Sequence, residues 1–120
     1  MRRLEAAFKA AGDPTRMRVL KLLEGGELCV CQVQSVLGLA PSTVSKHLAL
    51  LRSAGLVEDR RDGRWIRYRL ASEGQSVDAD GVLSLLARSL GRDARIAADR
   101  RRLREVLKVP VAELCGRGPR

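Results

Sequence analysis

Aromatic side chains are rare in this sequence, which has one Phe, one Trp and one Tyr among its 120 residues. A chain of this length is expected to form one domain with a single core, and leucine, valine and alanine must supply most of that core. The only histidine is His47, and the sequence contains no glycine-rich phosphate loop, no paired carboxylates and no Ser-His-Asp set. These absences argue against an enzyme.

Long apolar runs are also absent, since no stretch approaches the roughly 18 apolar residues that span a bilayer. Residues 1–5 are basic but are not followed by the apolar segment of a secretory signal. We therefore expect a cytoplasmic protein without a membrane partner, in a compartment where thiols stay reduced. Its three cysteines, an odd number, fit metal or metalloid ligation or redox sensing better than a structural disulfide framework.

Positive charge, in contrast, is abundant. The formal net charge is +9 at pH 7, and a strongly basic balance is typical of proteins that bind nucleic acids. A basic surface without such a partner is the alternative that charge alone leaves open.

The spacing of apolar residues predicts a mostly α fold with one small β-hairpin. Asp13-Pro14 is a helix start signal, because Asp caps the first turn and Pro fits the first helical position. Asp62-Gly63 is a hairpin turn signal. The expected helices are residues 3–11, 14–24, 28–37, 41–54 and helical segments within 80–108 that Gly91 interrupts, and the expected strands are 56–60 and 64–70. Residues 111–120 are expected to form a frayed tail.

The predicted helix 41–54 has a polar N-terminal half that suits the major groove of DNA. Its candidate DNA contacts are Ser42, Thr43, Ser45 and Lys46. The arginines of the hairpin are candidate contacts to phosphates, namely Arg60, Arg61, Arg64 and Arg67. Trp65 and Tyr68 are expected to pack the hairpin rather than stack on bases, and His47 is expected to play a structural part.

Four segments occur in the order found in the ArsR/SmtB repressors, which the sequence resembles from about Phe8 to Leu70. They are Gly12–Leu20, Glu27–Cys31, Ser42–Leu48 and Gly63–Tyr68. With its Cys-Val-Cys pair, the chain looks like the arsenic-responsive branch. The resemblance implies a single winged helix-turn-helix domain over 1–120, with flanking dimerisation helices at about 3–11 and 80–108. It also implies a homodimer that binds inverted-repeat operator DNA and leaves it when trivalent arsenic or antimony, As(III) or Sb(III), binds.

Soft thiolates select soft cations and metalloids, and trivalent arsenic favours three of them. Cys29 and Cys31 are the first two candidate ligands. Arsenic repressors of the best-known type carry a further cysteine three residues after this pair, where the present sequence has Gln34. Cys115 is therefore the remaining candidate for the third ligand.

Cys29 and Cys31 would point about 200° apart on a regular helix. They can share one ion only if the first turn of helix 28–37 is distorted or lies outside the helix. We expect ligation to unwind the start of this helix, which supports the recognition helix. We also expect the helix N-terminus and nearby basic side chains to lower the thiol pKa values.

Two other functions are compatible with the same fold. In one, Cys29 and Cys31 are oxidised and the protein is a thiol-based redox-sensing repressor. In the other, the effector is Cd, Pb or Zn. The latter is less favoured, because the C-terminal helices lack the His/Asp cluster of zinc-sensing relatives and the N-terminus lacks the cysteine of cadmium and lead sensors.

The terminal helices carry more apolar side chains than a small monomer hides easily. Those expected to be exposed are Leu4, Phe8, Val82, Leu86, Leu90, Ile96 and Leu103. A two-fold dimer would cover them and place two recognition helices one DNA turn apart, roughly 34 Å.

Overall fold

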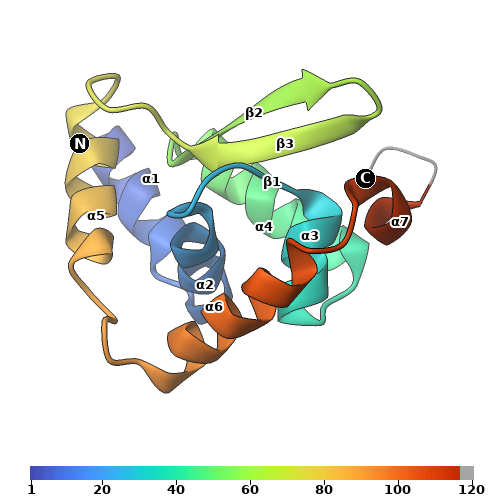
Figure 1. The fold of residues 1–120 in the computed structure, drawn as a ribbon. Coiled ribbons are helices and arrows are strands. Elements are labelled where there is room, and N and C mark those ends of the chain that lie inside the picture. Colours follow the sequence, from blue (N-terminus) through green and yellow to red (C-terminus); the bar gives the residue numbers. More distant parts are fainter. Residues whose placement is uncertain (117–120) are drawn as a thin grey trace.

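The computed structural model describes residues 1–116, and in it a small sheet lies along one side of a group of helices (Figure 1). The helices are α1 (Arg2–Ala11), α2 (Pro14–Leu23), α3 (Val30–Leu37), α4 (Pro41–Ser53), α5 (Val77–Ala87), α6 (Ala94–Val106) and α7 (Val111–Cys115). The strands are β1 (Leu28–Cys29), β2 (Val57–Asp62) and β3 (Trp65–Leu70). The predicted mostly α fold with a hairpin wing is confirmed. Residues 117–120, the end of the predicted tail, lie outside the described residues.

The local signals at the helix ends act as predicted. The Asp13 carboxylate accepts a hydrogen bond from the Arg16 N–H at 3.0 Å, and Pro14 is the first residue of α2. Between α3 and α4, Gly38 has a φ of +71°, which residues with a Cβ rarely adopt. This glycine allows the tight turn that joins the two helices of the helix-turn-helix.

β2 and β3 form the antiparallel wing, with Asp62 opposite Trp65. The turn consists of Gly63 and Arg64, one residue later than predicted, and β2 extends to Asp62 rather than ending at Arg60. Gly63 has a φ of +61°, and glycine at the first position of a two-residue turn suits the twist of a hairpin.

A third strand, β1, lies on the other side of β3, so the sheet order is β1-β3-β2. Leu28 pairs with Tyr68 and Cys29 pairs with Arg67. The sequence did not predict this strand, because two residues are too few to show an alternating pattern. The predicted helix 28–37 therefore begins two residues later, at Val30.

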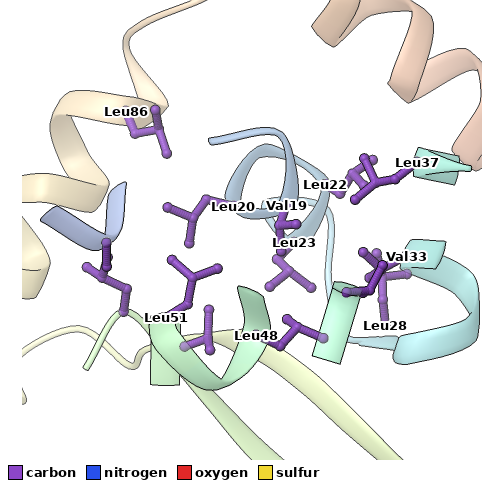
Figure 2. Close-up of a cluster of buried hydrophobic side chains, with 14 of the residues drawn as sticks. Val19, Leu20, Leu22, Leu23, Leu28, Val33, Leu37, Leu48, Leu51 and Leu86 are labelled. Carbon is purple, nitrogen blue, oxygen red and sulfur yellow. The ribbon is translucent and has the colours of Figure 1, made fainter. Parts of the chain in front are cut away.

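One aliphatic core holds the helices and the sheet together. Figure 2 shows leucines of α2 facing leucines of α4, with Leu86 of α5 at the edge of the cluster. Val19, Leu20, Leu48, Leu51 and Leu56 have no exposed surface. Burial of a leucine side chain contributes about 2 kcal/mol, so this cluster fixes α4 relative to the rest of the domain.

Two basic residues of α2 attach the C-terminal helices. Arg18 forms a two-pronged ion pair with Asp99 of α6, with N–O distances of 2.8 and 2.9 Å. The buried Lys21 ammonium donates to the carbonyl oxygens of Leu86 and Ser89 at the end of α5, at 3.0 and 3.2 Å. Neither pairing was predicted, since each joins residues more than 60 positions apart.

The prediction of exposed apolar side chains is only partly correct. Leu4 and Phe8 of α1 are exposed, but Val82, Leu86 and Ile96 are buried within the monomer. Leu85 of α5 is also exposed, as are Leu50 of α4 and Leu107 after α6. α1 and α5 run side by side (Figure 1) and flank a shallow apolar groove of about 270 Å³. Among residues 1–116, no helix is both long and apolar enough to cross a membrane.

Candidate thiol site and DNA-binding surface

The three cysteines lie together in a buried cluster that is separate from the main core. Cys29, Cys31 and Cys115 are exposed by only 1%, 3% and 1%. They come from β1, α3 and α7, and α7 packs against α3 on the side of the domain away from α1 and α5 (Figure 1). The fold therefore brings together all three candidate ligands.

Cys29 lies outside the helix, which removes the geometric conflict expected from the sequence. It is the N-cap residue of α3, with an extended backbone (φ −79°, ψ 158°), and Cys31 is in the first helical turn. The Gln32 side chain accepts a hydrogen bond from the Cys29 N–H at 2.8 Å. Both cysteines can thus face one cluster, and the predicted unwinding of α3 is not needed for this.

Cys115 is not part of a frayed tail, because residues 111–115 form helix α7. Cys31 and Cys115 are joined by a disulfide, with Cα atoms 5.3 Å apart, and Cys29 is a free thiol. This pairing differs from the expected reduced thiols. In this oxidised form, no group of three or more His, Cys, Asp or Glu side chains in residues 1–116 is arranged to hold a metal ion.

The environment of Cys29 does not favour thiolate, contrary to the sequence-based prediction. Burial raises the pKa of the Cys29 thiol, and the positive charge of Arg67 opposes this only in part. An apolar site disfavours the charged form. The folded protein therefore holds this thiol protonated at neutral pH.

Trp65 and Val111 cover the cysteine cluster. The indole Nε1 of Trp65 is buried and has no hydrogen-bond partner among the described residues. From the sequence, Trp65 is expected to pack the wing, and its contact with the thiols is not predicted. The pairing of β1 with β3 that places it there could not be read from the sequence.

The N-terminal half of α4 presents the predicted polar surface. Ser42, Thr43 and Lys46 are exposed, and Ser45 is half-buried. His47 Nδ1 lies 3.3 Å from the Arg16 guanidinium, which is consistent with the structural part expected for it. The surface can donate hydrogen bonds to DNA, while the other face of α4 is anchored in the core.

The four arginines of the wing differ in their exposure and in the ion pairs that they form. Arg60 pairs with Glu27 at 2.7 Å, and Arg67 pairs with Asp62 at 2.6 Å. Arg61 and Arg64 are exposed near the tip of the hairpin. Arg60 is exposed as well, so three of the four arginines are accessible to phosphates, and Arg67 is half-buried.

Comparisons with known proteins agree with this geometry. The arsR family of bacterial regulatory proteins matches residues 13–59. The chain is 45% identical over 91 residues to the arsenic resistance transcriptional regulator ArsR1 of Pseudomonas putida, covering 72% of this chain and 71% of that protein. It is 48% identical over 65 residues to the arsenical resistance operon repressor of Escherichia coli K12, covering 53% of this chain and 56% of that protein.

Among solved structures, the fold matches the homodimeric winged helix-turn-helix DNA-binding domain Mb0332 from Mycobacterium bovis. The TM-score is 0.62 at 33% identity, covering 71% of this chain and 75% of that one.

Fold and sequence together define a winged helix-turn-helix transcriptional regulator. The chain belongs to the arsR family, on the branch of the arsenic-resistance repressors.

Proposed function

We propose that this repressor binds inverted-repeat operator DNA as a homodimer and releases it when As(III) or Sb(III) binds Cys29, Cys31 and Cys115. The observation that supports the proposal most is the burial of these three cysteines in one cluster. The arsenic-resistance relatives support the same effector. The protein needs no cofactor for this function.

The chemistry requires three reduced thiols. The Cys31–Cys115 disulfide must first accept two electrons and two protons from a cellular dithiol. Each cysteine thiol then replaces one hydroxyl group of arsenous acid and releases one water molecule, so no net proton is lost. The buried, protonated Cys29 is compatible with this exchange, and the apolar surroundings exclude water that would hydrolyse the As–S bonds.

The DNA contacts follow from the position of α4 and the wing. Ser42, Thr43, Ser45 and Lys46 would enter the major groove, and the wing arginines would contact phosphates. Arg60, Arg61 and Arg64 are exposed, and the half-buried Arg67 would reach DNA if its ion pair with Asp62 opens. Exposed Leu4 and Phe8, together with the groove between α1 and α5, would form the dimer contact.

The proposal is tested with protein reduced by a phosphine and a DNA duplex that the protein selects from a random-sequence pool. Fluorescence anisotropy follows release of the duplex as arsenite is added. Wild type should release DNA, whereas Cys29→Ser should bind the duplex equally well and retain it. If both proteins release DNA at the same arsenite concentration, the thiol site is not the effector site.

The disulfide supports a second candidate function, a redox-sensing repressor. Here Cys31 and Cys115 would lose two electrons and two protons to an oxidant such as a peroxide, which would be reduced to water. Mild peroxide should then release DNA from wild type but not from Cys115→Ser. The two functions are separable, because arsenite acts on the reduced protein without any oxidant.

A further inference from the structure

The thiol site is attached directly to the wing. Its first cysteine, Cys29, is in β1 and pairs with Arg67 of the wing strand β3. Two residues earlier, Glu27 binds the Arg60 guanidinium of β2 with N–O distances of 2.7 and 2.8 Å. A displacement of β1 therefore has a short path to both strands of the wing.

Trp65 is the side chain of the wing that contacts the cysteines. It is the first residue of β3, it is partly buried, and it packs against the cluster of Cys29, Cys31 and Cys115. On the same strand it precedes Arg67, and the exposed Arg64 lies next to it in the turn. The indole thus joins the thiols to the tip that carries the candidate phosphate contacts.

Arsenic binding must change the surroundings of this indole. In this structure two of the three sulfur atoms are bonded to each other. In the complex all three would instead be ligands of one arsenic atom. Protein interiors are close-packed, so a rearrangement of this size moves the side chains that line it. The buried Nε1–H of Trp65 has no acceptor among residues 1–116, so no hydrogen bond of that group holds the ring in place.

We propose that Trp65 is the positioning residue through which the occupied thiol site displaces the wing from DNA. This inference rests on the proposed function, and it names the wing as the element that responds. The alternative route runs along α3 to the recognition helix α4. Because Cys29 is already outside α3, ligand binding does not require that helix to unwind, which favours the route through the wing.

A first test uses the fact that Trp65 is the only tryptophan. Arsenite added to the reduced protein should change the intensity or the emission maximum of its fluorescence, with saturation at one arsenic per chain. Cys29→Ser/Cys31→Ser, which keeps one thiol of the cluster, should show no such change. An unchanged wild-type spectrum at full arsenic occupancy, counted by mass spectrometry, would overturn the inference.

A second test separates arsenic binding from DNA release. Trp65→Ala should bind DNA and one arsenic per chain, but its half-release should need about tenfold more arsenite, a typical size for coupling between two sites. Trp65→Phe, which keeps an aromatic ring on the cysteines, should restore most of the response. Ile66→Ala is the matched control, since Ile66 is a half-buried neighbour on the opposite face of β3.

The outcomes distinguish this inference from the proposed function. If wild type binds no arsenic at its thiols, the proposed function fails. If wild type responds and Trp65→Ala releases DNA at the wild-type arsenite concentration, the function stands and the role of Trp65 is wrong. If Ile66→Ala shows the same loss as Trp65→Ala, the effect reflects general damage to the wing and the specific role of Trp65 is also rejected.

Discussion

Cys31 and Cys115 are 84 residues apart in sequence, yet their Cα atoms lie 5.3 Å apart and their side chains are bonded. Helix α7 makes this approach by packing on α3. A cysteine near the C-terminus therefore lies beside Cys31. Under the proposed function it would supply the third thiol, which the family pattern has at the position of Gln34.

Cys115→Ser should weaken the response to arsenite without abolishing it. Removing one of three soft ligands leaves the thiols of Cys29 and Cys31, which still hold trivalent arsenic. The arsenite concentration for half-release of DNA should rise. Cys29→Ser should show no release over the same range, because Cys29 is the ligand on the strand that pairs with the wing. An unchanged dose for Cys115→Ser would show that Cys115 is not a ligand.

The pKa of Cys29 should lie above that of an ordinary cysteine, about 8.5, because burial disfavours the thiolate. The protonated Cys29 thiol then contributes to the free energy of unfolding. This contribution is fully present at pH values below the ordinary cysteine pKa, and it is lost as the pH rises through the pKa that Cys29 has in the folded protein. The pKa is measured from the Cβ chemical shift in Cys31→Ser/Cys115→Ser, where Cys29 is the only thiol. Arg67→Ala should raise it further. Arg61→Ala, which removes an exposed charge from the wing, should not.

Arg18→Ala should lower the free energy of unfolding by about 2 kcal/mol. The change removes the guanidinium partner of Asp99, a residue that is only 6% exposed. The loss of stability should be smaller than for a fully buried ion pair, because the Arg18 side chain keeps some exposure. Urea unfolding monitored by circular dichroism gives the value. Arg100→Ala breaks the more exposed pair with Glu24 and should cost no more than about 0.5 kcal/mol. Equal losses would contradict the assignment.

Lys46→Ala should weaken binding to the selected duplex by about 1–3 kcal/mol, because Lys46 is exposed on the recognition helix. Arg101→Ala is the control, since it removes an equal charge from the exposed surface of α6. Affinities are compared at several salt concentrations, because phosphate contacts make binding steeply salt-dependent. Equal losses for the two variants would remove Lys46 from the interface.

Leu85→Lys should convert the protein from dimer to monomer. Leu85 is 52% exposed and lines the groove between α1 and α5, so a charge there would be buried in the proposed dimer contact. Sedimentation at micromolar concentration reports the change. Leu107→Lys alters an equally exposed leucine after α6, 53% exposed, and should remain dimeric. A wild-type monomer would reject the dimer proposal.

Much of the fold could be predicted because its signals are local. Asp13-Pro14 starts a helix, Gly38 ends one, and the alternation around Trp65 marks a strand. The long-range contacts had no such signal. The burial of Val82 and Ile96 depends on how α5 and α6 return to the body of the domain, and Arg18 gives no sequence sign of its partner Asp99.

The thiol site shows the same division. The sequence identified all three cysteines, but it predicted a lowered pKa, a helical Cys29 and a frayed segment around Cys115. Each of these expectations failed for a tertiary reason. Pairing of β1 with β3 keeps Cys29 outside α3, the surrounding side chains bury its thiol, and α7 packs on α3.

X-ray absorption of the arsenite complex of the reduced protein counts the sulfur atoms bound to arsenic. Arsenic should have three sulfur neighbours in wild type and two in Cys115→Ser. Two sulfur neighbours in both proteins, or oxygen neighbours alone in wild type, would contradict a site built from Cys29, Cys31 and Cys115.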